Sequence, residues 1–547
     1  MSFNLRSLLP RAALCLLAAG LCAAEGRALA QPRRAQAAAE GPAAQVIAEA
    51  VAALERGDEQ AARSLFGRAL ELEPRNVTAL TYLGVLADRA GQFAEAERHF
   101  AAAAIAAPRL PSARNNHGAI LLRLGRTREA ARQFEVSLKL DKNQPSALVN
   151  LAQIRFISGL PADLNEARDL FRRAYALAPD AEIARALTVI ALKLKDRAAA
   201  AEHYRDYSKL LAASGVPQSV AARADLGGAL LEAELFAEAA AELKAAAEAD
   251  PMNADVAVRL ARAYIGLKDL PAAGRALEGA VARGVEAAPV YALLASVYEK
   301  SGHIENAIPA MRLAIERDPQ REEYRFAYGM LLTGVLAPAA AVIRLEESLK
   351  LFPNSARLWF ALGLAQFKWG KNDDAAKALT RATELDPKFA PAYAYLGMTF
   401  VELGRYDEAV KLYEQALAAD PSLGVVHYLI ADVLLKKPDA DLARVETELA
   451  RSVAMDETFA PARLALGKVF MRTNRYAEAA RELERVITAD PKVAEAYYQL
   501  GRAYMRLGRK DEAQAHLDTF KRLSEEQKEQ LQNERREIVR RLANVNF

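Results

Sequence analysis

Cysteine is almost absent from this chain. Only two cysteines occur in 547 residues, Cys15 and Cys22, and both lie within residues 1–30. Neither follows the Leu-small-small triplet of a lipoprotein signal. If this segment is removed, the mature chain has no thiol, which excludes disulfide bonds, thiol catalysis and cysteine-rich metal sites.

Residues typical of catalytic and metal sites are also scarce. The six histidines lie far apart in the sequence, and none has a second ligand at zinc spacing. No Gly-x-Ser-x-Gly motif occurs, and Gly370-Lys371 lacks the glycine spacing and the Ser or Thr of a phosphate-binding loop. The sequence therefore predicts a protein that is not an enzyme and needs no cofactor or metal. The histidines are His99, His117, His203, His303, His427 and His516.

The charge is balanced. The chain has 73 Lys and Arg against 70 Asp and Glu. Residues 1–30 hold three Arg and one Glu, so the remainder has 70 basic and 69 acidic residues, a net charge of +1. This balance predicts no general attraction to nucleic acid or to an anionic membrane.

The N-terminus has the features of an export signal. Arg6 and Arg11 are followed by an apolar run over residues 12–24, then by a small-x-small site at residues 28–30. The run is shorter than the ~20 residues that span a bilayer, so a retained membrane helix is the weaker alternative. We predict a signal peptide over 1–30, cut after Ala30, a flexible leader over 31–42, and a periplasmic or secreted protein.

Prolines mark a repeating unit. Pro319, Pro353, Pro387 and Pro421 follow one another at intervals of 34 residues, as Pro74 and Pro108 do. Small and bulky residues keep the same period at spacings of three, four and seven, which are helical spacings. The pattern in each unit therefore predicts two helices joined by a turn that usually holds a glycine. The proline ends the second helix. The turn glycines are Gly91, Gly125, Gly302, Gly370, Gly404 and Gly508.

Within each unit, the order of bulky aromatic, Leu-Gly, Ala, Phe and Pro resembles the tetratricopeptide repeat. Trp359 with Leu362-Gly363, and Tyr393 with Leu396-Gly397, are examples. The resemblance covers about fourteen units between Ala43 and Leu523 and implies an all-α, right-handed superhelical solenoid. Repeats of this kind bind proteins or peptides along a concave face lined by the first helices. The chaperone-type carboxylate clamp of the family, Lys with Asn four residues later, is absent.

Two irregularities suggest boundaries. The unit over 180–215 has no closing proline and continues into "LLAASGVPQS", which predicts sub-arrays at 43–215 and 216–523. The segment 524–547 begins at Ser524 and carries a single apolar face, which predicts a C-terminal capping helix. A helix free to dock on a partner is the alternative.

The predicted inner face differs between the two halves. In the C-terminal half its positions carry an apolar stripe edged by positive charge, which favours a groove for an extended or helical segment with acidic flanks. The same side chains could instead form the seam between neighbouring first helices. The candidate groove residues are Phe326, Met330, Phe360, Leu364, Phe367, Lys368, Met398, Tyr428, Lys436, Met471, Arg472, Tyr498, Met505 and Arg506.

We therefore predict an exported scaffold that binds proteins during cell-envelope assembly or export. One alternative is an accessory subunit for polysaccharide synthesis or export. Others are a repeat domain that regulates a separately encoded enzyme, and a mechanical spacer.

Overall fold

All regular secondary structure in the described residues is α-helical. The computed structural model describes residues 42–335, 337–526 and 540. Within these ranges it contains 28 helices, which confirms the all-α prediction. None of them is long and apolar enough to cross a membrane. The predicted signal peptide, the leader up to residue 41, and most of the predicted cap (527–539 and 541–547) lie outside the described residues.

The chain divides into two compact units, Met1–Val285 and Glu286–Phe547. In the described part of unit 1 the helices are α2 (Ala44–Glu55), α3 (Glu59–Leu72), α4 (Val77–Arg89), α5 (Phe93–Ala106), α6 (Pro111–Arg123), α7 (Thr127–Leu140), α8 (Pro145–Ser158), α9 (Pro161–Leu177), α10 (Ala181–Lys193), α11 (Arg197–Ser214), α12 (Val220–Glu232), α13 (Phe236–Ala249), α14 (Ala254–Gly266) and α15 (Leu270–Ala282).

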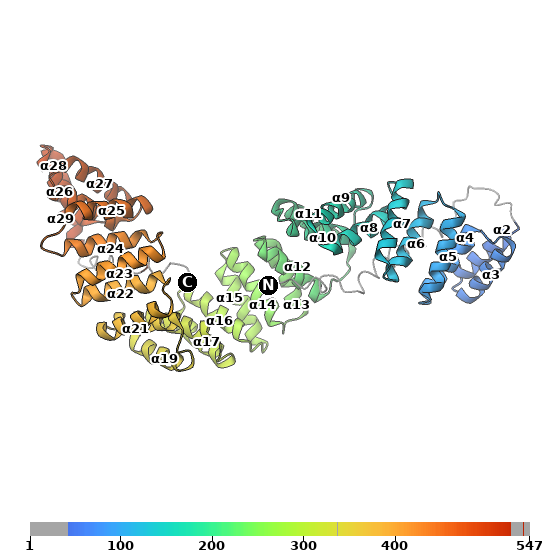
Figure 1. The fold of residues 1–547 in the computed structure, drawn as a ribbon, viewed down its shortest axis with the longest axis horizontal. Helices are drawn as coiled ribbons and strands as arrows, with labels where there is room; N and C mark the ends of the chain where they lie inside the picture. The colour runs from blue at the N-terminus through green and yellow to red at the C-terminus, as the bar shows by residue number, and fades with distance from the viewer. Residues whose placement is uncertain (1–41, 336, 527–539, 541–547) are drawn as a thin grey trace. The chain divides into compact units, whose positions relative to one another are not determined.

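In the described part of unit 2 the helices are α16 (Ala288–Lys300), α17 (Ile304–Arg317), α18 (Glu322–Gly334), α19 (Pro338–Leu351), α20 (Ala356–Lys368), α21 (Asn372–Leu385), α22 (Ala390–Glu402), α23 (Tyr406–Ala419), α24 (Gly424–Leu435), α25 (Leu442–Met455), α26 (Ala460–Arg472), α27 (Tyr476–Ala489), α28 (Ala494–Arg506) and α29 (Lys510–Glu526). Within each unit, helices pair into hairpins that follow one another in chain order (Figure 1). The described helices form fourteen hairpins, as the repeat count predicts.

A close approach between the two helices of a hairpin explains the Leu-Gly pair. A Cβ at Gly397 in α22 would lie 2.5 Å from the Tyr413 ring in α23. Gly363 in α20 meets Leu379 in α21 at 2.5 Å in the same way. In both hairpins the bulky residue comes 16 positions after the glycine. The small residue therefore makes room for the bulky one, as the repeat predicts.

The ends of the helices also follow the predicted chemistry. Pro353 comes two residues after α19 ends, and all six predicted turn glycines have positive φ. Trp359 lies in α20, and its Nε1 donates a hydrogen bond at 2.8 Å to the carbonyl of Pro353 in the turn before that helix. Trp359 also packs against the core of unit 2, so it occupies the predicted scaffold position.

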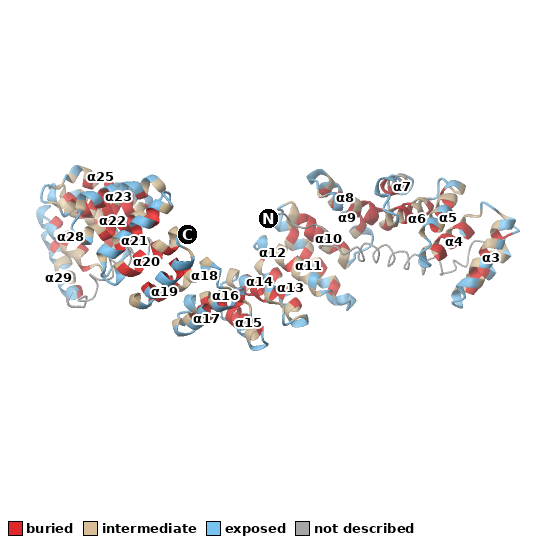
Figure 2. Ribbon diagram, turned by 60° about the horizontal axis from the view of Figure 1, so that its bottom comes forward, coloured by how far each residue is buried: buried red, intermediate tan, exposed pale blue. Residues whose placement is uncertain are grey.

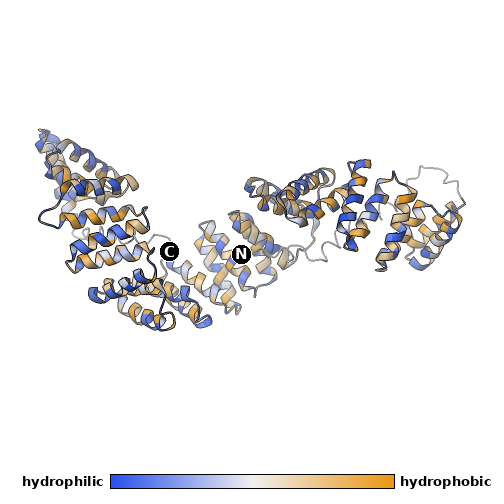
Figure 3. Cartoon of the chain, in the orientation of Figure 1, coloured by the Kyte–Doolittle hydropathy of each residue, from blue (hydrophilic) through white to orange (hydrophobic). Residues whose placement is uncertain are grey.

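Each unit has a core made from the facing sides of its helices. Buried residues lie where helices pack on one another, while exposed residues gather at turns and on outward sides (Figure 2). Hydropathy follows the same division along individual helices (Figure 3). The largest core cluster of unit 2 extends from Phe326 to Ala513, and that of unit 1 from Leu121 to Ala263.

The core of unit 1 continues across the predicted break at 215/216. Tyr204 in α11 donates its hydroxyl to Glu242 in α13 at 3.0 Å, and Arg223 in α12 lies 3.3 Å from the same carboxylate. Gln218 in the connection donates to Glu182 in α10 at 2.9 Å. Side chains on both sides of Gly215 share one core, and the two compact units meet at 285/286, so the boundary between sub-arrays at 215/216 stays a prediction.

The last described hairpin extends into the predicted cap. Helix α29 continues through Ser524, whose hydroxyl donates to the Lys521 carbonyl at 2.9 Å. Ser524 therefore lies inside a helix and does not begin one.

Candidate functional site

The candidate site is the side of unit 2 formed by the first helices of its hairpins, which we call the first-helix face. We define it by helices α18, α20, α22, α24, α26 and α28, which carry thirteen of the fourteen candidate groove residues, and by Lys436, which directly follows α24. Successive first helices, such as α18 and α20 or α26 and α28, contact one another directly. A residue on these helices can therefore point either to the neighbouring helix or to the surface.

Five of the fourteen candidates are buried in the core of unit 2. Phe360 is 0% exposed, and its ring lies 5.0 Å from Phe389 and 5.6 Å from Tyr395 of the next hairpin. Tyr428 likewise packs on Phe459 of the following hairpin, with ring centroids 5.3 Å apart. These side chains form the seam between hairpins. The five are Phe326, Phe360, Leu364, Met398 and Tyr428.

The other nine candidates reach the surface to different degrees. Met505 is 52% exposed, and Phe367 is half-buried with its ring edge toward Tyr395. The half-buried residues are Met330, Phe367, Met471 and Tyr498, and the exposed ones are Lys368, Lys436, Arg472, Met505 and Arg506. The partner-binding role of all fourteen stays a prediction, and the geometry leaves these nine as the surface that could carry it.

Three cations at the ends of first helices are not neutralised within the described residues. Lys368, Arg472 and Arg506 form no ion pair there, although each is the last residue of a first helix. The acids on the same face have other partners: Asp432 lies 2.8 Å from Lys436, and Glu495 lies 3.4 Å from Lys468. An excess of cationic side chains therefore remains available to a ligand.

The second helices show the opposite pattern. Arg475 at the start of α27 lies 2.7 Å from Glu446 and 2.6 Å from Glu478, and these carboxylates raise its pKa. Arg381 in α21 lies 3.0 Å from Glu384. Cations on second helices thus commonly have acidic neighbours, which gives the first-helix face its electrostatic contrast.

Lys368 combines exposure with desolvation. The residue as a whole is exposed, but protein atoms crowd its ammonium group and lower its pKa. Desolvation disfavours the charged form of a lysine, so a nearby carboxylate from a ligand would interact favourably with it.

Sequence reasoning missed Arg357 in the first turn of α20. Its guanidinium carbon lies 4.4 Å from the centroid of the Phe326 ring. Its buried Nε has no hydrogen-bond partner among the described residues. The signal was present in the spacing, because Arg357 precedes Lys368 by 11 residues, three helical turns along the same face.

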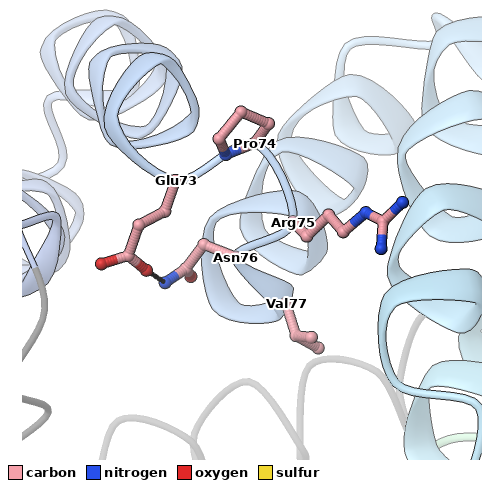
Figure 4. A pocket seen from close by; sticks show the side chains of 5 residues that line it. All are labelled: Glu73, Pro74, Arg75, Asn76 and Val77. Atoms are coloured by element: carbon pink, nitrogen blue, oxygen red, sulfur yellow. Dashed lines mark hydrogen bonds between the residues drawn. The ribbon is translucent and has the colours of Figure 1, made fainter.

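Two hollows elsewhere are explained by the scaffold. The first lies at the turn between α3 and α4 and is lined by residues 73–77 (Figure 4). There Asn76 Nδ2 donates to Glu73 at 2.8 Å, while its Oδ1 accepts from the Ala79 amide at 3.1 Å and caps α4. Both ends of this amide are used for local structure, which explains the side chain without a ligand.

The second hollow lies between α21 and the end of α22, on the second-helix side of unit 2. Most of its charged lining residues pair locally, as Lys377 does with Asp374 at 3.2 Å and Arg405 with Glu408. Among the described residues, no group of three or more His, Cys, Asp and Glu side chains could hold a metal ion.

Stacked helical hairpins with a patterned first-helix face define a helical-repeat scaffold. The chain belongs to the tetratricopeptide repeat family. One family model described as tetratricopeptide repeat matches residues 47–111, 115–182, 338–390, 366–423, 396–452 and 464–526. Two further models with the same description match residues 230–297 and 288–321. Chains of this family serve as scaffolds for protein–protein interaction, and this part of the functional prediction is supported.

Several solved structures are similar over most of their length. Yeast Tom70 is 16% identical, with 86% of this chain and 96% of that chain covered and a TM-score of 0.37. A chain of the APC/C Cut9–Hcn1 hetero-tetramer is 14% identical, with 98% and 99% covered and a TM-score of 0.36. PilF of Pseudomonas aeruginosa is 18% identical, with 38% and 94% covered and a TM-score of 0.34. At these scores the similarities carry no functional argument. A comparison with curated proteins found no significant match.

Proposed function

We propose that this protein is an exported scaffold that binds segments of other proteins on the first-helix face of unit 2 and acts in cell-envelope assembly or export. The observation that carries the binding site is the contrast between this face, where Lys368, Arg472 and Arg506 have no acidic partner among the described residues, and the second helices, where cations commonly have one. The export-signal features of residues 1–30 support the location.

The proposed mechanism is serial contact without chemistry. Half-buried Met330 and Phe367 supply apolar contacts, and thioether side chains adapt to partners of different shape. Cations at the helix ends supply charge pairing. Several weak contacts along one rigid face can give useful affinity and leave the partner chemically unchanged.

Photo-crosslinking in cells tests the site. A photoreactive residue at Phe367 or Met505 should capture a protein from the envelope. The same residue at Lys377 in α21, whose side chain is 79% exposed on the second-helix side, should capture far less. Equal capture from both sides would contradict the proposed face.

Export is tested separately. Intact-mass measurement of the purified mature protein should show that it begins at Gln31, and the protein should fractionate outside the cytoplasm. A full-length chain retained in the cytoplasm would contradict the proposed location without affecting the binding face.

A further inference from the structure

Two neighbouring first helices, α26 and α28, end in the same pair of residue types on the first-helix face. Met471 and Arg472 end α26, and Met505 and Arg506 occupy the equivalent positions 34 residues later at the end of α28. The two helices contact one another, so the Met-Arg pairs lie on neighbouring hairpins. Arg502 lies one turn before Arg506. We call these five residues the Met-Arg patch.

The three arginines of this patch have no acidic partner among the described residues. Arg502 donates a hydrogen bond to Gln499 at 3.4 Å and lies 5.6 Å from the centroid of the Tyr498 ring. The nearby acid Glu495 already interacts with Lys468 at 3.4 Å. Three guanidinium groups therefore share one surface without local neutralisation.

Helix-end electrostatics explain only part of this arrangement. A basic residue in the last turn interacts favourably with the negative end of a helix. Lys350 in the last turn of α19 shows that a second helix can carry such a residue too. The interaction of a basic residue with a helix end does not require an apolar neighbour. Here, however, Met505 is 52% exposed next to Arg506, and Met471 is half-buried next to Arg472.

From this juxtaposition we propose that the Met-Arg patch binds an acidic protein segment whose carboxylates alternate with apolar side chains. Guanidinium groups pair well with carboxylates because their donors form a planar fork, and methionine accepts apolar side chains of varied shape. The inference rests on the proposed function and specifies the chemistry of its partner.

The C-terminal segment of this chain does not have the required charge. Residues 527–547 contain five Lys and Arg against three Asp and Glu, a net charge of +2. Like charges would oppose its docking beside three arginines. Charge complementarity therefore favours a separate acidic segment as the occupant.

A random-peptide display library selected on the full-length mature protein tests the inference. Enriched peptides should be acidic and should contain apolar residues. Their affinity should fall about tenfold in the double variant Arg472→Gln/Arg506→Gln, the combined effect expected from losing two exposed charge pairs. Added salt should weaken binding to the parent protein more than binding to the variant.

A matched variant controls for the loss of net charge. Lys350→Gln/Lys388→Gln removes two exposed cations that form no ion pair in the described residues, one of them also in the last turn of a helix. Its affinity for the enriched peptides should equal that of the parent. An equal loss in both double variants would show nonspecific attraction and would overturn the inference.

The remaining outcomes separate the inference from the function on which it rests. Neutral or basic enriched peptides whose binding depends on Phe367 would overturn the acidic partner but leave the scaffold function standing. Self-association that disappears in Arg472→Gln/Arg506→Gln would assign the patch to a second copy and overturn the inference. Selection of no peptide, together with no crosslinking from this face, would overturn both.

Discussion

The role of Phe360 distinguishes a partner-binding groove from a packing seam between hairpins, and its replacement by alanine gives the sharpest test of the structure. The side chain is 0% exposed and packs on two rings of the next hairpin, at 5.0 and 5.6 Å. A buried aromatic side chain covers on the order of 150–250 Å², which at about 25 cal/mol per Å² corresponds to ~4–6 kcal/mol. Alanine retains the Cβ, so Phe360→Ala should destabilise the surrounding hairpins by ~3–5 kcal/mol.

Hydrogen exchange on the full-length protein is the suitable assay, because repeat arrays can open locally and a single global unfolding energy can hide the effect. Amide exchange in α20 and α22 should accelerate by about two to four orders of magnitude if local opening governs it. Phe367→Ala is the control: its ring is half-buried, so roughly half the effect is expected. Unchanged protection in Phe360→Ala, with partner binding lost, would refute the seam and restore Phe360 as a binding residue.

Four further predictions concern the scaffold. Gly397→Ala should destabilise unit 2 by ~1–3 kcal/mol because its Cβ would meet the buried Tyr413 ring. In contrast, Gly67→Ala, with no atom within 4 Å, should stabilise α3 by up to ~1 kcal/mol in thermal melts. Asn76→Ala removes the cap of α4 and should cost ~0.5–2 kcal/mol, detected as faster exchange in the first turn of that helix. Burial raises the pKa of the Glu242 carboxyl group in the folded protein. The contribution of this group to folding stability is therefore complete below its ordinary pKa of 4.5 and is lost as pH rises through its pKa in the folded state. The melting temperature of the parent protein relative to Glu242→Gln should therefore increase as pH falls from neutral toward 4.5, and a constant difference would contradict this assignment.

Much of the fold follows from local sequence chemistry. Pro353 and Gly370 mark helix ends because proline cannot continue the hydrogen-bond ladder and glycine adopts positive φ readily. The pairing of Gly397 with Tyr413 follows from volumes that recur within one hairpin, where both partners are close in sequence. Such short-range constraints can be recognised without any knowledge of long-range contacts.

Contacts between hairpins were harder to predict. The missing proline after α11 predicts a boundary between sub-arrays near Gly215, and it gives no sign that Tyr204, Arg223 and Glu242 connect three helices across that point. Arg223 and Glu242 lie in one hairpin at the positions that Arg463 and Glu482 occupy in a later one, but Tyr204 and Glu242 are 38 residues apart and belong to different hairpins. Their partnership depends on how one hairpin lies on the next, which a periodic pattern does not specify.

The candidate site shows the same limit. Helical spacing placed Phe360, Phe367 and Lys368 on the correct helix, but successive residues on a helix point about 100° apart. A side chain near the edge of a face can therefore turn either to the neighbouring helix or to solvent. Packing placed Phe360 in the seam, left Phe367 half-buried and left Lys368 exposed.

The sequence by itself determined that this protein is a stack of helical hairpins, because side-chain volumes and helix-ending residues recur every 34 positions within reach of local contacts. Only the tertiary structure decided which apolar residues fill the seams and which cations lack an acidic neighbour. Both depend on the angle and offset between successive hairpins, and those arise from all the contacts of the packed core together.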